Sequence, residues 1–179
     1  MQMSPRNNKG LTIIELIVYI GLLALVIALT SQFILGILRA NISGGAQEEL
    51  VSSIEQATDA IDRELRGATA VYTPTSVFNA HPGQLSLSTA QHLPAGEQVT
   101  YIDFFLSDDG RICMKQESLV SQCFTSQKIQ VTSLKFVRLV TSGGVEAVQT
   151  LITAKYRSDQ PNLQTPYSVQ TTTVIRAGE

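Results

Sequence analysis

The sequence predicts an α+β protein in which a long N-terminal helix packs on a C-terminal antiparallel sheet. The first observation is a run of 23 residues without a charged side chain, from Leu16 to Leu38. The second is an amphipathic helical pattern that follows it, and the third is a series of short alternating segments beyond residue 71. A helix that spans a membrane needs about 20 apolar residues, and no second run approaches that length. More than one membrane span is therefore excluded.

These patterns divide the chain into four parts. Residues 1–10 form a short basic leader, and residues 11–38 form an apolar helix. Residues 39–70 are expected to be the amphipathic half of the same helix, and residues 71–179 a β-rich globular head. The parts differ in composition as well as in pattern, so each is expected to meet a different environment.

The composition excludes several classes of function. Residues 39–179 hold 25 of the 28 charged residues, so the first part of the chain is unlike a cytoplasmic soluble enzyme. The net charge of −2 argues against a nucleic-acid partner, which would select a basic face. Two cysteines are too few for a disulfide scaffold or for a zinc site with four cysteine ligands.

Three interpretations of the apolar run compete. A secretory signal peptide has an apolar core of about 7–15 residues followed by small residues at a cleavage site. Here the run is longer, and its best small residues, at 40–46, lie well past it. An uncleaved single-span anchor would place Arg6 and Lys9 on the cytoplasmic side. The third interpretation uses the residues that border the run.

The border reads Lys9-Gly10-Leu11-Thr12-Ile13-Ile14-Glu15, and the apolar helix continues from there. Glu15 is a lone carboxylate inside an apolar segment. At the centre of a bilayer such a group costs roughly 2.5–3.5 kcal/mol or more, and the cost is lower near the start of the helix. Ionisable residues inside membrane segments are therefore functional candidates, and Glu15 is one.

This border resembles the N-terminal motif of the type IV pilins and the type II secretion pseudopilins. In that family a prepilin peptidase cleaves after the glycine, which implies cleavage between Gly10 and Leu11 and methylation of the new amine on Leu11. The usual residue at the first mature position is Phe, so Leu11 departs from the pattern. The resemblance also implies that Glu15 pairs with the N-terminal amine of a neighbouring subunit. The alternative is that its carboxylate only reaches the lipid headgroups.

The resemblance implies a structural subunit that is not an enzyme and needs no cofactor. It would be a single-pass protein of the bacterial cytoplasmic (inner) membrane, with its head outside the cytoplasm, and later part of an extracellular or periplasmic filament. The implied partners are other pilin or pseudopilin subunits in a homo- or hetero-assembly, the prepilin peptidase, an inner-membrane assembly platform, and membrane lipid before assembly. A minor pilin or pseudopilin is favoured. A major pilin and a membrane-anchored ligand-binding module are the alternatives.

The amphipathic half carries an apolar stripe with steps of 4, 4, 3, 4, 4 and 3 residues, which is a helical spacing. Charged residues cover the other faces, and the sequence does not separate solvated acidic residues from acidic residues that contact neighbouring subunits. Gly44-Gly45 is a candidate break in the helix. The stripe consists of Ala46, Leu50, Ile54, Ala57, Ile61, Leu65 and Ala68.

The head is predicted to be an antiparallel sheet of four or more strands. Asp108-Asp109-Gly110 is a turn signal between two strand candidates and predicts a hairpin. Within Ile129–Val140 the alternation of apolar residues shifts near Ser133, which predicts a β-bulge. The strand candidates are Leu85–Ser88, Gln98–Leu106, Arg111–Lys115, Ile129–Val140, residues 148–156 and residues 167–175.

The candidate chemical sites of the head are few. Outside the cytoplasm, Cys113 and Cys123 can form a disulfide that closes a short loop, and two free buried thiols are the alternative. His81 and His92 lie in loop-like stretches without metal-ligand spacing. Asp108 and its neighbours are explained by the turn, and we expect neither a metal site nor a catalytic one.

Overall fold

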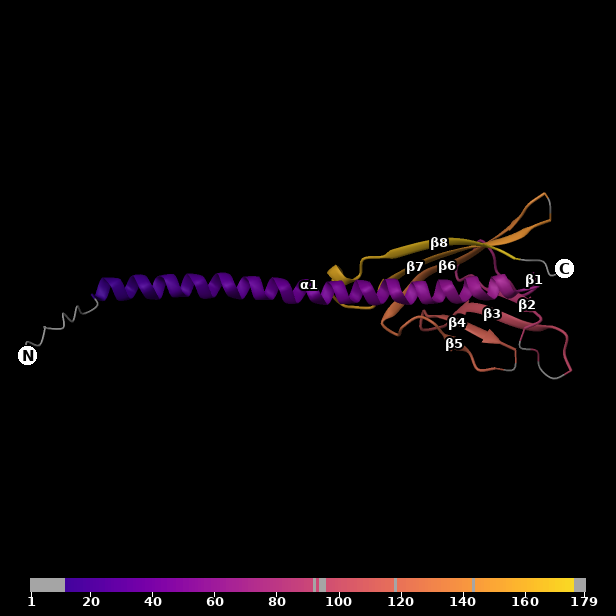
Figure 1. Cartoon of the computed structure of the whole chain (residues 1–179), viewed down its shortest axis with the longest axis horizontal. Helices are drawn as coiled ribbons and strands as arrows, with labels where there is room; N and C mark the ends of the chain where they lie inside the picture. Colours follow the sequence, from indigo (N-terminus) through magenta and orange to yellow (C-terminus); the bar gives the residue numbers. More distant parts are fainter. Residues whose placement is uncertain (1–11, 92, 94–95, 118, 143, 176–179) are drawn as a thin grey trace, which may run out of the picture. The chain divides into compact units, whose positions relative to one another are not determined.

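The computed structural model describes residues 12–91, 93, 96–117, 119–142 and 144–175. It contains one long N-terminal helix followed by antiparallel sheets, which confirms the predicted α+β class (Figure 1). The chain forms two compact units, Met1–Ile42 and Ser43–Glu179. The first holds the apolar half of the helix, and the second holds its amphipathic half together with the sheets.

Helix α1 extends over Ile13–Gly67 and passes through Gly44-Gly45 without a break. Each glycine costs a helix only about 1 kcal/mol relative to alanine, and α1 contains no proline. The predicted apolar stripe is confirmed, because every residue in it is buried. The helix ends earlier than the predicted residue 70, since Ala70 already pairs with a strand.

Two antiparallel sheets take the place of the single sheet that we expected. The first has five strands in the order β1-β2-β3-β4-β5, and the second has three in the order β6-β7-β8. A short 3₁₀ helix, η1 (Pro161–Leu163), lies between β7 and β8. The strands are β1 (Ala70–Val71), β2 (Leu85–Thr89), β3 (Thr100–Leu106), β4 (Ile112–Gln116), β5 (Gln122–Cys123), β6 (Ile129–Val140), β7 (Glu146–Tyr156) and β8 (Tyr167–Val174).

The predicted hairpin and the predicted bulge are both present. Strands β3 and β4 pair antiparallel around a turn in which the Gly110 amide donates to the Ser107 carbonyl over 2.8 Å. Gly110 has a φ of +77°, a conformation that glycine adopts without strain. The register between β6 and β7 shifts between Val131 and Ser133. Local sequence therefore determines both features.

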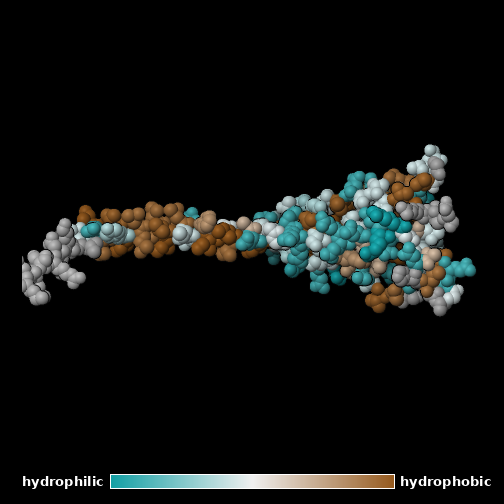
Figure 2. Space-filling view, in the orientation of Figure 1, coloured by the Kyte–Doolittle hydropathy of each residue, from teal (hydrophilic) through white to brown (hydrophobic). Residues whose placement is uncertain are grey.

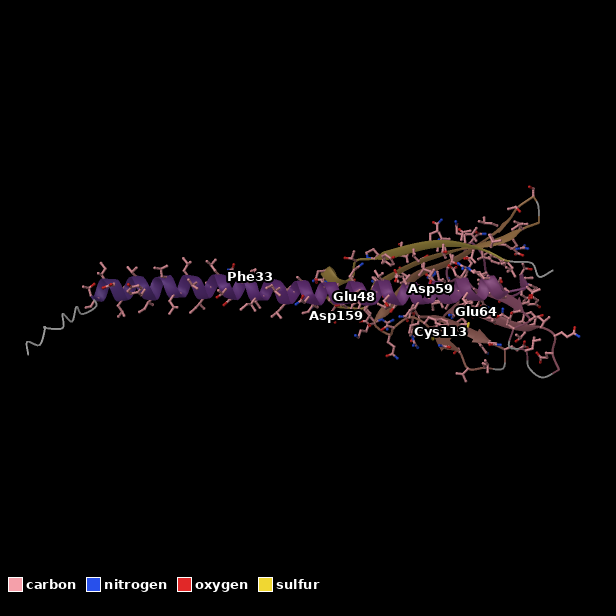
Figure 3. The ribbon with its side chains drawn as sticks, in the orientation of Figure 1. Phe33, Glu48, Asp59, Glu64, Cys113 and Asp159 are labelled. Carbon is pink, nitrogen blue, oxygen red and sulfur yellow. A yellow bond between two sulfur atoms is a disulfide. The ribbon has the colours of Figure 1, made fainter. Side chains whose placement is uncertain are left out.

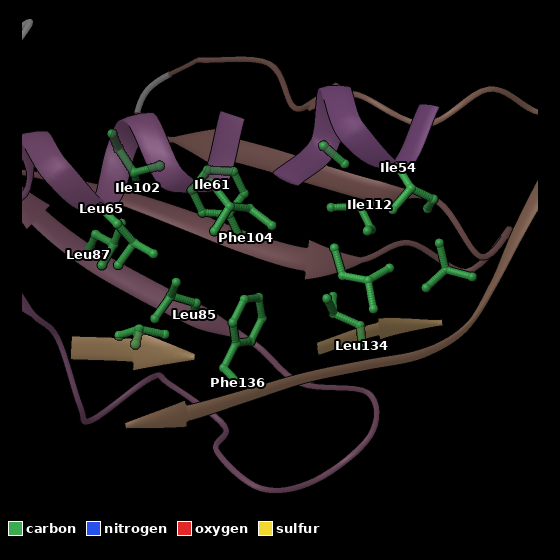
Figure 4. Packing of buried hydrophobic residues seen from close by; sticks show 14 of the residues in the cluster. Ile54, Ile61, Leu65, Leu85, Leu87, Ile102, Phe104, Ile112, Leu134 and Phe136 are labelled. Atoms are coloured by element: carbon green, nitrogen blue, oxygen red, sulfur yellow. The ribbon is translucent and has the colours of Figure 1, made fainter. Parts of the chain in front are cut away.

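One hydrophobic core joins the helix to both sheets (Figure 4). Side chains from α1 meet side chains from strands of each sheet, so neither sheet has a core of its own. Because burial of a large aliphatic or aromatic side chain contributes about 1.5–3 kcal/mol, this cluster is the main source of stability for the head. Its fully buried members include Leu50, Ile54, Ile61, Leu65, Leu85, Phe104, Leu134 and Phe136.

The loop before β2 covers the outer edge of β6. The Asn79 amide donates to the Phe136 carbonyl and the Gly83 amide donates to the Leu134 carbonyl, each over 2.9 Å. The exposed imidazole of His81 accepts from the Leu134 amide through Nδ1 at 3.1 Å. His81 therefore supports this edge, whereas His92 lies outside the described residues. The edge of β6 is closed to further strands at Leu134 and Phe136.

Substitution of Gly83 by alanine is expected to destabilise the head by about 1–3 kcal/mol, because it overpacks a filled site. A Cβ atom there would lie 3.0 Å from the Leu134 carbonyl oxygen and 3.1 Å from Cδ2 of Phe136. The measurement is denaturant unfolding of the full chain in detergent micelles, followed by circular dichroism. Gly45→Ala is the matched control, since its Cβ meets open space. Equal stability of Gly83→Ala and wild type would contradict this packing.

Candidate assembly surface

The apolar half of α1 presents its hydrophobic side chains on all sides. Every large hydrophobic residue from Ile13 to Leu38 is exposed, and brown surface covers this segment in Figure 2. Its length and composition suit a membrane crossing. An apolar surface of this extent is not stable in water, so lipid or protein must cover it.

Glu15 lies in the first turn of α1, where it takes part in capping. Its amide donates to Oγ1 of Thr12 over 3.4 Å, and the Leu16 amide donates to the Thr12 carbonyl. Thr-x-x-Glu at a helix start is the pattern of a capping box, and an acidic residue there also suits the helix dipole. We did not predict this local role from the sequence, although the spacing of Thr12 and Glu15 signals it.

Of the three residues predicted to act in cleavage, methylation and assembly, the structure describes only Glu15. Gly10 and Leu11, where cleavage and methylation are expected, lie outside the described residues. The Glu15 carboxylate is exposed and has no ion-pair partner within the part of the chain that the structure describes. The Glu15 carboxylate can therefore form an ion pair with a cation of a second molecule.

Two hydroxyl groups of the apolar segment, those of Thr30 and Ser31, are satisfied within the helix. Thr30 donates to the Val26 carbonyl over 2.9 Å, and Ser31 donates to the Ile27 carbonyl over 2.8 Å. Side chains bonded in this way need no further partner in an apolar environment. Glu15 differs from them, because its charge is not satisfied by the helix alone.

One carboxylate of the amphipathic half is used inside the head. The Ser126 hydroxyl donates to Oε1 of Glu49 over 2.9 Å, and Nζ of Lys128 donates to Oε2 over 3.2 Å. The hydrogen bond from Lys128 to Glu49 raises the pKa of the lysine above its usual value, and the carboxylate charge acts in the same direction. Glu49 therefore ties α1 to the segment before β6 and is occupied within its own subunit.

A second carboxylate ties α1 to the last strand. The Thr173 hydroxyl donates to Asp62 over 2.7 Å, and the Thr171 hydroxyl donates to it over 3.2 Å. Thr171 and Thr173 lie two apart on β8, so both side chains point to the same face of the sheet. Asp62 therefore fixes β8 against the helix.

Five of the remaining charges of the helix form a face with separated signs. Arg39 and Glu64 lie outside this face, and Glu64 forms an ion pair with Arg63 over 3.6 Å. Glu48, Glu55, Asp59, Arg63 and Arg66 follow one another by 7, 4, 4 and 3 residues, and all five are exposed. These steps place them on one side of the helix, opposite the buried stripe. The three acidic residues precede the two basic ones; Figure 3 labels Glu48 and Asp59. We call this set the charged face.

The cysteine pair lies in the first sheet. Cys113 and Cys123 face each other in the pairing of β4 with β5, and their sulfur atoms form a disulfide (Figure 3). Cys113 is buried, whereas Leu119 and Val120, inside the closed loop, are exposed. The disulfide thus holds an exposed apolar loop on the head.

The acidic turn between β3 and β4 is structural. The Ser107 hydroxyl and the Arg111 guanidinium both bond the Asp109 carboxylate, and they hold the pKa of Asp109 below its usual value. Among the described residues no three His, Cys, Asp or Glu side chains gather as metal ligands. The turn therefore has an explanation in its own hydrogen bonds.

No family model, no curated protein and no solved structure matches the chain. The architecture itself, a long N-terminal apolar helix followed by antiparallel sheets, is compatible with a pilin-like subunit. Any finer functional assignment must therefore be argued from the residues of this chain.

Proposed function

We propose that the chain is a structural subunit of a type IV pilus or a type II secretion pseudopilus, and not an enzyme. The observation that carries this proposal is the apolar half of α1, whose large side chains are all exposed while a single carboxylate, Glu15, lies in its first turn. Such a helix needs an apolar environment on every side. A bilayer provides one before assembly, and the packed helices of a filament provide one afterwards.

The proposed course begins in the bacterial inner membrane, with the head outside the cytoplasm. The prepilin peptidase cleaves between Gly10 and Leu11, the new amine is methylated, and an assembly platform moves the subunit into the filament. The Cys113–Cys123 disulfide supports this placement, because disulfides persist outside the cytoplasm. A minor pilin or pseudopilin remains the favoured subunit type, because Ile129–Val140 and the Thr-rich residues 171–175 resemble the heads of minor pseudopilins.

The test is mass spectrometry of the mature protein. A chain that begins with methylated Leu11 supports the proposal. A chain that still begins with Met1 in cells with an active prepilin peptidase overturns it, and cleavage near residues 40–46 would identify a signal peptide instead. Abundance in sheared surface filaments then separates a major pilin from a minor one.

The charged face supports a contact between subunits in such a filament. Its acidic and basic ends are complementary when two copies stand side by side, shifted along the helix axis. Asp59 and Arg66 are seven residues apart, which is about 10 Å along a helix with a rise of 1.5 Å per residue. We propose that Glu55 and Asp59 of one subunit meet Arg63 and Arg66 of a shifted neighbour. Arg63 also pairs with Glu64 of its own chain over 3.6 Å, but its side chain stays largely exposed and can bind a second carboxylate.

Reversal of two acidic charges, Glu55→Lys with Asp59→Lys, is expected to reduce incorporation into filaments by roughly tenfold, because like charges then face each other across the contact. The free energy of unfolding should change by less than about 0.5 kcal/mol for each exposed substitution. Incorporation is measured by immunoblot of sheared filaments.

The matched control is Glu97→Lys with Glu117→Lys, which changes the net charge equally at exposed positions away from the charged face. Adding Arg63→Glu and Arg66→Glu to the reversed chain should restore incorporation between copies of this chain. Equal incorporation of the reversed chain and the control would show that the charged face is only solvated.

A further inference from the structure

Strand β8 is the outer strand of its sheet and has a free edge. It pairs with β7 alone, and the Ile175 amide continues this ladder by donating to the Glu146 carbonyl. Because antiparallel residues alternate in direction, the backbone groups of every second residue of β8 point away from β7. No backbone partner for them occurs among the described residues. These residues are Ser168, Gln170, Thr172 and Val174.

This edge lacks the devices that normally prevent strands from adding to a sheet. The eight residues of Tyr167–Val174 include no charge, no proline and no glycine, and their register with β7 is regular. The opposite edge of the same sheet is covered at Leu134 and Phe136 by the loop before β2. A regular, uncharged edge strand is a template for another chain.

A hollow beside the edge carries a positive charge. Arg66, at the end of α1, lines it together with Thr172, Thr173 and Val174. Arg66 has no ion-pair partner in the described part of the chain. A strand lying on the β8 edge would bring a side chain to this guanidinium, and a carboxylate is the group that an arginine binds best.

We propose that the β8 edge receives an extended strand of another protein, which adds to the sheet and places an acidic side chain on Arg66. Main-chain hydrogen bonds would supply affinity, and the carboxylate would supply selectivity. A second copy of this chain fits less well, because β8 itself has no acidic residue to meet Arg66. The inference goes beyond the proposed function, since it requires neither a membrane segment nor a filament. Arg66 binds the added strand on a subunit in which no neighbour's carboxylate already holds it.

The test is amide hydrogen exchange of the full chain in detergent micelles. The probe is the capped peptide Thr-Val-Thr-Val-Thr-Glu-Thr at millimolar concentration, with a twin in which Gln replaces Glu. The Glu peptide should slow exchange at Ser168, Gln170, Thr172 and Val174. The twin should bind about tenfold more weakly, as expected for the loss of one charged hydrogen bond.

Two variants make the test specific. Thr172→Pro removes an amide that points away from β7, so it should abolish slowing by the peptide while the sheet stays folded. Thr172→Val keeps the amide and loses the same hydroxyl, so it should behave as wild type. Arg66→Gln should remove the preference for the Glu peptide over its twin.

Several results would overturn the proposal. The proposal fails if neither peptide slows exchange at the four amides, or if the Glu peptide slows exchange equally in Thr172→Pro and in wild type. Slow exchange without peptide that grows with protein concentration would mean that a second copy occupies the edge. Slow exchange that is independent of concentration would mean that the chain covers the edge itself.

Discussion

Chains carrying Glu15→Ala are expected to be cleaved between Gly10 and Leu11 and yet to be missing from filaments. The peptidase acts before the subunit leaves the membrane, whereas the carboxylate is needed when the apolar helices pack together. Removing one partner of a buried ion pair costs about 3–5 kcal/mol, so incorporation should fall by roughly a hundredfold or more. Mass spectrometry of the membrane fraction reports cleavage, and an immunoblot of sheared filaments reports incorporation.

The capping geometry supplies a sharper control for this prediction. Glu15→Gln keeps the length of the side chain and the pattern of a capping box but removes the charge. Thr12→Ala does the reverse: it removes the hydroxyl that accepts from the Glu15 amide, at a cost of about 1 kcal/mol, and keeps the carboxylate. If pairing with an amine is the role of Glu15, the Gln variant fails to assemble and the Thr12 variant assembles. Assembly of Glu15→Gln at the wild-type level would leave capping as the only role.

Features governed by local pattern were predictable from the sequence. The stripe from Ala46 to Ala68 is buried throughout, and the bounds of β6 agree with the predicted Ile129–Val140. Both follow from the periodicity of apolar residues, which a single segment contains in full. The turn at Gly110 and the bulge near Ser133 also depend on a few neighbouring residues.

Features that join distant segments were not predictable in the same way. The division into two sheets depends on which strands pair, and one apolar face looks the same in either sheet. The hydrogen bonds of Glu49 and Asp62 link α1 to residues 77 to 111 positions away. Nothing in the helix sequence distinguishes these two from the acidic residues of the charged face.

The functional residues also differ in whether they depend on local sequence or on distant segments. Glu15 stands out in the sequence because a charge interrupts an apolar helix, and its capping by Thr12 follows from local spacing. The free edge of β8 could not be found from the sequence, because it depends on which strands neighbour β8 and on the loop that closes the other edge. Gly10 and Leu11 remain predictions from the resemblance.

Substitution of Phe136 by alanine is expected to lower the free energy of unfolding of the head by about 3–5 kcal/mol. Phe136 lies on β6, is fully buried, and belongs to the core that joins α1 to both sheets. Its loss leaves a cavity that α1 and the strands cannot close without giving up other contacts. Since domains are stable by only about 5–15 kcal/mol, this is a large share of the total. Thermal unfolding of the full chain in micelles measures the effect.

Two further substitutions on β6 serve as controls for Phe136→Ala, and cleavage after Gly10 serves as a functional readout. Phe136→Leu keeps most of the volume and should cost less than about 1.5 kcal/mol, while Lys135→Ala, on the exposed face, should change stability by less than about 0.5 kcal/mol. Cleavage after Gly10 should be normal in all three variants, because the substitutions lie within the head, in the compact unit Ser43–Glu179. A head defect then reduces assembly through loss of folded subunits, whereas Glu15→Ala reduces it with the head intact. Equal unfolding temperatures for Phe136→Ala and Lys135→Ala would show that the shared core does not stabilise the head as we argue.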